Sequence, residues 1–118
     1  MKTVVIGASD NPARYSYKAI KALMSHQHEV VAVSNKKSDV LGLQIQGVDV
    51  IEEGVDTITM YVGPQHQSHY EDYILLTKPR RVIFNPGTEN QTFEEKLKNQ
   101  GIIVEEACTL VLLSTGQF

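Results

Sequence analysis

The chain has 118 residues, of which 42% are hydrophobic and 21% are charged, and its formal net charge is −3. This length fits one compact domain with its own hydrophobic core. The small net charge provides no general attraction to nucleic acid or to an anionic membrane. The single cysteine, Cys108, excludes an intramolecular disulfide and a thiolate-rich zinc site. No apolar stretch is long enough for a signal peptide or a membrane span, so we expect a cytoplasmic protein.

Short apolar runs alternate along the chain with amphipathic patterns. The apolar runs predict strands over Thr3–Ile6, Glu29–Val33, Thr57–Val62, Arg81–Phe84 and Ile102–Val104. The amphipathic patterns predict helices over Tyr15–His26, over Gln65–Thr77, and over a segment that starts near a Thr92/Glu95 capping box and stops at Gly101. This alternation predicts one α/β domain over residues 1–118.

The pattern does not decide the secondary structure of two segments. Between Ser38 and Gly54 we expect a turn at Leu41-Gly42-Leu43 and a short strand within Gln44–Val50. Residues Cys108–Leu113 fit either a terminal helix or a sixth strand. The rest of the pattern predicts a three-layer, Rossmann-like fold with a mostly parallel sheet of about five strands. Ligands of such sheets bind beyond the carboxyl ends of the strands.

The loop after the first strand begins Gly7-Ala8-Ser9, where a dinucleotide fingerprint has Gly-x-Gly, and it has Pro12 where the last glycine would lie. We expect free backbone N–H groups and the positive end of a helix dipole here, which suits a phosphate. Ser9 or Asn11 is expected to cap the helix. The competing interpretation is a capped helix start that only adds stability.

The loop after the second strand reads Ser34-Asn35-Lys36-Lys37. An NAD-binding domain has an acidic residue here to bind the ribose hydroxyls. Two lysines instead suit a phosphorylated ribose, as in NADP or coenzyme A (CoA). Adjacent lysines on a solvated surface would look the same.

The third and fourth main strands end in Gly63-Pro64 and in Pro86-Gly87-Thr88-Glu89. Small and rigid residues at these positions leave room for the extended arm of a ligand. Turn formation alone also explains them.

Together these motifs resemble the small bacterial CoA-binding domain proteins, which are related to the CoA-binding domain of the succinyl-CoA synthetase alpha subunit. The resemblance covers nearly the whole chain. It depends on Gly7-Ala8-Ser9, Asn11-Pro12, Tyr15-Ser16, Asn35-Lys36 before Leu41-Gly42, Pro86-Gly87-Thr88-Glu89 and the closing run Cys108–Leu113.

The resemblance implies that CoA or an acyl-CoA lies along the strand ends. Its pyrophosphate would approach the first loop, its adenosine and 3′-phosphate the second, and its pantetheine arm the third and fourth. The residues expected to contact it are Gly7, Ala8, Ser9, Asn11, Pro12, Arg14, Tyr15, Asn35, Lys36, Lys37, Gly63, Pro64, Pro86, Gly87 and Thr88. The synthetase subunit continues into a second domain with a phosphorylated histidine, which has no counterpart here. The resemblance therefore implies binding and not ligase chemistry.

No catalytic or metal constellation is visible. His66 and His69 are three residues apart but have no evident third ligand, and Cys108 follows two glutamates that disfavour a thiolate. We expect non-catalytic binding of CoA or acyl-CoA. The alternatives are an NADP-binding reductase, a CoA-ligase-like subunit that needs a partner for catalysis, and an interaction module. Tyr70 and Tyr73 with the segment 111–113 form a homodimer face or complete the core.

Overall fold

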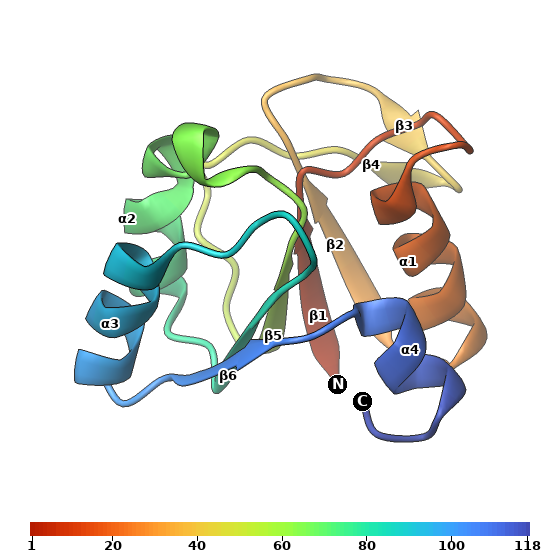
Figure 1. The fold of residues 1–118 in the computed structure, drawn as a ribbon. Coiled ribbons are helices and arrows are strands. Elements are labelled where there is room, and N and C mark those ends of the chain that lie inside the picture. The colour runs from red at the N-terminus through yellow and green to blue at the C-terminus, as the bar shows by residue number, and fades with distance from the viewer.

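The structure is a computed structural model that describes all residues 1–118, and its centre is a five-stranded sheet (Figure 1). The strand order is β2-β1-β5-β6-β7, and every neighbouring pair is parallel. The strands are β1 (Lys2–Ile6), β2 (Glu29–Val33), β5 (Val55–Met60), β6 (Arg81–Phe84) and β7 (Ile103–Glu106). This confirms the predicted sheet.

Four helices and one short 3-10 helix connect or follow these strands. They are α1 (Tyr15–Ser25), η1 (Pro64–His66), α2 (Ser68–Thr77), α3 (Gln91–Asn99) and α4 (Thr109–Ser114). Helices α2 and α3 cover one face of the sheet, and α1 and α4 cover the other (Figure 1). The three-layer, Rossmann-like α/β class is therefore confirmed. No helix here has both the length and the apolar character that a membrane span requires.

Each face of the sheet has its own apolar core, because successive side chains of a strand point to opposite faces. In β1, Val4 and Ile6 pack toward α2 and α3, whereas Val5 packs toward α1. Tyr70 and Tyr73 belong to the core under α2 and are buried. These tyrosines therefore complete the core, whereas Val111 of the segment 111–113 is exposed.

The two open segments have definite structures. Strands β3 (Asp39–Val40) and β4 (Leu43–Gln44) form a hairpin, and both residues of its turn, Leu41 and Gly42, have a positive φ. The expected strand within Gln44–Val50 is thus shorter and begins one residue earlier, with one further bridge between Val33 and Gln46. Residues Thr109–Ser114 form helix α4 rather than a sixth strand.

The predicted capping box of the third main helix was wrong. Helix α3 begins at Gln91, and its N-cap is Asn90, whose side-chain oxygen accepts a hydrogen bond from the Phe93 N–H at 3.2 Å. The Glu94 carboxylate accepts one from the Asn90 N–H at 2.9 Å. The N-cap lies two residues before the predicted one because Asn90 has the extended backbone that an N-cap needs, whereas Thr92 already lies within the helix.

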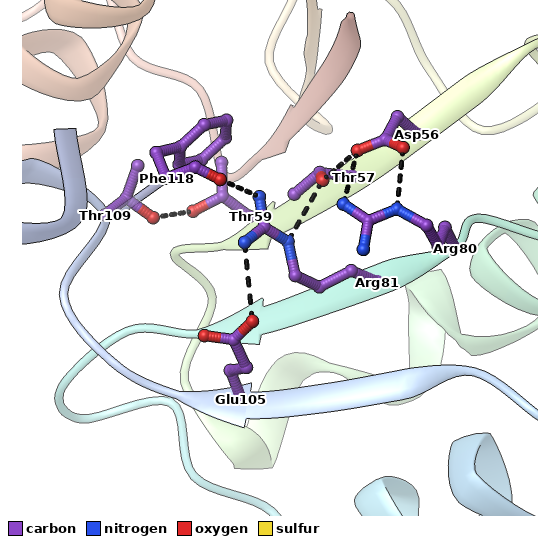
Figure 2. A network of polar contacts seen from close by, with 8 residues as sticks. All are labelled: Asp56, Thr57, Thr59, Arg80, Arg81, Glu105, Thr109 and Phe118. Carbon is purple, nitrogen blue, oxygen red and sulfur yellow. Dashed lines mark hydrogen bonds and ion pairs between the residues drawn. The ribbon is translucent and has the colours of Figure 1, made fainter. Parts of the chain in front are cut away.

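The buried side chain of Arg81 connects strands β5, β6 and β7 with the C-terminal residue, Phe118 (Figure 2). Arg81 in β6 donates hydrogen bonds to the Thr57 hydroxyl at 3.2 Å, the Glu105 carboxylate at 3.3 Å and the Phe118 carbonyl at 3.1 Å. Its guanidinium also lies 4.6 Å from the centre of the Phe118 ring. The neighbouring Arg80 is exposed and forms a two-bond ion pair with Asp56, which lowers the pKa of that carboxyl to about 2.

We expect Arg81→Lys to lower the free energy of unfolding by about 2 kcal/mol, because an ammonium cannot reach the three acceptors and the aromatic ring together. The matched change Arg80→Lys removes an exposed pair and should cost less than about 1 kcal/mol. Denaturant unfolding of both variants measures the difference. Equal losses would contradict the structural role of Arg81.

Candidate functional site

A cleft of about 770 Å³ opens at the carboxyl ends of β1, β2, β5 and β6. The sheet order places the switch in winding direction at β1 and β5, because α1 and α2 leave these strands toward opposite faces. The expected residues that line the cleft are Gly7, Ala8, Ser9, Arg14, Tyr15, Asn35, Lys36, Gly63, Pro86, Gly87 and Thr88. Asn11, Pro12, Lys37 and Pro64 do not line it.

The structure adds lining residues that the sequence did not indicate. They are Ala13, Ser16, Ser34, Tyr61, Val62, His66, His69 and Tyr70. Ser16 and Ser34 adjoin expected residues, so proximity in the sequence was a usable signal for them. The two histidines and Tyr70 come from η1 and α2, and only the folded arrangement brings them to the loops after β1 and β2.

The turn at Gly7 differs from the expected phosphate loop. Gly7 has a φ of +90°, and a Cβ atom there would lie 3.0 Å from a methyl of Val62 and 3.1 Å from the Tyr61 backbone. The backbone N–H groups of Gly7 and Ala8 both donate to the Val33 carbonyl, at 2.9 and 3.1 Å. The expectation that these N–H groups are free was therefore wrong. Glycine is needed here for the turn and for the close approach of β5.

Ser9 and Asn11 form local turns and do not cap α1. The Ser9 hydroxyl accepts from the Asn11 N–H at 3.1 Å, and the Asn11 side chain accepts from the Ala13 N–H at 3.0 Å. The N-cap position of α1 is Arg14, which provides no side-chain cap. The expected capping was thus wrong, because the loop is longer than the cap geometry allows.

The first turn of α1 therefore has unused hydrogen-bond donors. No hydrogen bond within the chain uses the backbone N–H groups of Tyr15, Ser16 or Tyr17. The Ser16 side chain lines the cleft, and the residue is only 4% exposed. Its hydroxyl also has no hydrogen-bond partner within the chain. Arg14 lies beside these donors and forms no ion pair. An anion at this position meets free N–H groups, a hydroxyl, a cation and a helix dipole.

Lys36 is already oriented by an acidic neighbour. Its ammonium lies 3.8 Å from the Asp10 carboxylate, which also accepts a hydrogen bond from the Ser38 hydroxyl at 2.6 Å. The Ser38 hydrogen bond and then the Lys36 charge lower the pKa of Asp10. The pair is exposed, so an incoming phosphate can take the place of Asp10 at little cost. Lys37 lies outside the cleft.

Two buried amide side chains hold the loops after β5 and β6. The Gln67 amide nitrogen donates to the carbonyls of Val62 at 2.9 Å and Thr88 at 2.6 Å. The Asn85 amide nitrogen donates to the Thr59 hydroxyl at 2.7 Å and to the Met60 carbonyl at 2.8 Å. The two loops therefore form one rigid wall of the cleft.

The lining of the cleft has basic side chains and no acidic ones. It includes Arg14, Lys36, His66 and His69 but no carboxylate, although the chain has 14 acidic residues. The nearby Cys108 does not line the cleft. Burial raises the pKa of Tyr61 to about 12, so this phenol stays neutral near pH 7. The cleft is suited to bind an anion.

A parallel sheet with a cleft at its switch point defines a Rossmann-like domain, a fold in which ligands bind at this place. The sequence matches the CoA binding domain family over residues 1–114. The chain belongs to this family. No curated protein matches the sequence.

Solved structures agree on the fold. The crystal structure of an uncharacterized protein is 50% identical, with a TM-score of 0.97 and coverage of 99% of this chain and 97% of that chain. A conserved hypothetical protein from Pyrococcus furiosus is 27% identical, with a TM-score of 0.77 and coverage of 88% and 90%. Cell-free ID.343 from Thermus thermophilus is 22% identical, with a TM-score of 0.86 and coverage of 99% and 90%.

We expect Gly7→Ala to lower the free energy of unfolding by about 3 kcal/mol, through left-handed strain and the clash with β5. Gly87 is the matched control, because it has a φ of +91° but open space around it. Gly87→Ala should cost only about 1 kcal/mol of strain. Denaturant unfolding compares the two, and similar losses would show that the Gly7 contact with β5 is unimportant.

Proposed function

We propose that the protein binds coenzyme A or an acyl-CoA in this cleft and holds it without transforming it. The observation that supports this most is the group of donors at the start of α1. The free N–H groups of Tyr15 and Ser16, the Ser16 hydroxyl and the Arg14 side chain belong to neighbouring residues that line a cleft without carboxylates. A pyrophosphate has the charge and the acceptors that this region needs.

The proposed pyrophosphate position differs from the one that the resemblance implies. It lies at the first turn of α1, at Tyr15 and Ser16, rather than against the N–H groups of Gly7 and Ala8, which are already bonded to β2. Asn35 and Lys36 lie on the side where the ribose phosphate would bind, and the pantetheine arm would follow Gly63 toward Pro86, Gly87 and Thr88.

The non-catalytic role rests on the chemistry of the lining. Acyl transfer needs a nucleophile that is hydrogen-bonded to a base. Histidines and hydroxyls both line the cleft, but no hydrogen bond of the structure joins one to the other. Holding or delivering CoA needs no groups beyond those of the cleft. An NADP-dependent reductase or a ligase-like subunit would need catalytic groups from a partner.

Thermal unfolding with CoA, acetyl-CoA, NADP, NAD and ATP tests the proposal. A ligand at 100 times its dissociation constant adds about 2.7 kcal/mol, which raises the midpoint by about 10 °C in a domain of this size. We expect CoA or acetyl-CoA to give the largest rise. A larger rise with NADP would favour the reductase, and no rise with millimolar CoA would refute CoA binding.

We also expect Arg14→Gln to weaken CoA binding about tenfold, because a charge-assisted contact with the pyrophosphate is lost. Lys21→Gln is the matched control, since Lys21 is exposed on α1 and lies outside the cleft. Calorimetric titration should find the control within twofold of the wild type. Equal affinity of the two variants would place the pyrophosphate elsewhere.

A further inference from the structure

Two histidines of the cleft have no role in the pyrophosphate contacts. His66 ends η1, and His69 lies in the first turn of α2. Both are exposed, and both line the cleft. No group of three His, Cys, Asp or Glu side chains is positioned to hold a metal ion, so another partner has to be sought for these imidazoles.

The histidines share a part of the cleft with the loop after β2. Ser34, Asn35 and Lys36 of that loop line the same cleft, and the loop arcs over the strand ends before it reaches β3 (Figure 1). Tyr70 connects the two walls. Burial raises the pKa of its phenol, and the nearby Asn35 backbone and Ser34 hydroxyl oppose this rise. The His69 ring packs on the Tyr70 ring at 4.9 Å.

The charges around the histidines favour an anion between these walls. From the other elements of the cleft, the side chains that can carry charge are Arg14, Lys36 and the phenols of Tyr15, Tyr61 and Tyr70. Asp10, which does not line the cleft, is paired with Lys36. On α2 itself, Glu71 is paired with Lys96, and neither Glu71 nor Asp72 lines the cleft. The imidazoles therefore have no carboxylate partner within the chain.

A phosphate monoester matches this arrangement better than a diester does. Its second ionisation falls near pH 6, so it gains negative charge in the range in which imidazoles titrate. A protonated imidazole and the Lys36 ammonium can then bind one dianion from opposite sides.

We propose that His66 and His69, together with Lys36, bind the phosphate monoester of a phosphorylated ribose and so select CoA over nucleotides without this phosphate. This inference rests on the proposed function and deepens it, because it names the residues that set ligand specificity. It adds two residues on η1 and α2 to a phosphate contact that the sequence indicated only through Lys36 and Lys37.

The test is calorimetric titration of the full chain with CoA and with dephospho-CoA, at pH 6 and at pH 8. The variants are His66→Gln with His69→Gln, and the control is His26→Gln, an exposed histidine at the end of α1. We expect the wild type to prefer CoA about tenfold or more at pH 6 and less at pH 8. The double variant should lose this pH dependence and most of the preference, and still bind dephospho-CoA as the wild type does.

The outcomes separate the two proposals. An unchanged preference and pH profile in the double variant would overturn the role of the histidines while CoA binding stands. Equal affinity of the wild type for CoA and dephospho-CoA would do the same. If the wild type bound neither compound, the proposed function would fail and the inference with it. An effect of His26→Gln equal to that of the double variant would also contradict the role of the histidines.

Discussion

The close approach of β1 and β5 at Gly7 is the constraint on which the cleft depends. A side chain at this position would meet the Tyr61 backbone, and only a left-handed φ lets the chain turn there toward β2. The turn is fixed by two N–H groups that share the Val33 carbonyl. The loop that follows then crosses the strand ends and delivers α1 with its first turn facing the cleft. The turn at Gly7 thus serves the packing of β1 against β5, and the free N–H donors of the cleft come from the first turn of α1.

The molecule separates its structural polar groups from its binding groups. Arg81, Asn85 and Gln67 are buried and have their hydrogen bonds satisfied within the chain. The donors at the start of α1 and the two cleft histidines are not satisfied in this way. Buried polar groups normally find partners, and Ser16 is the buried residue of this set whose hydroxyl has none within the chain, whereas Arg14, His66 and His69 are exposed to solvent. No carboxylate lines the cleft, although the chain has a net negative charge.

Much of the fold followed from local patterns, because strands and helices of an α/β domain have distinct apolar periods. The sheet, its parallel strands and the three main helices were predicted within a few residues. The exceptions depend on contacts that a local pattern does not contain. Helix α4 forms because Thr109 and Leu113, four residues apart, are both buried against the body of the domain. The cap of α3 lies at Asn90 because that backbone is extended.

Most of the residues expected from the sequence line one cleft at the strand ends, and their binding role stays a prediction. The Gly7 and Ala8 amides were misjudged, because the acceptor that takes them belongs to a different strand. Lys37 was expected to contact the ligand together with Lys36. It does not line the cleft, because neighbouring residues of a loop can point in different directions. His66 and His69 were considered as metal ligands and set aside for want of a third ligand, and the sequence does not show that both line the cleft.

The most direct test of CoA binding in this cleft is a crystal structure of the protein grown with CoA. The arrangement of donors predicts a pyrophosphate within hydrogen-bond distance of the Tyr15 and Ser16 N–H groups, with Arg14 beside it and the Gly7–Val33 hydrogen bond intact. A cleft without ligand at saturating CoA would contradict this account. So would a pyrophosphate bound directly to the Gly7 and Ala8 amides.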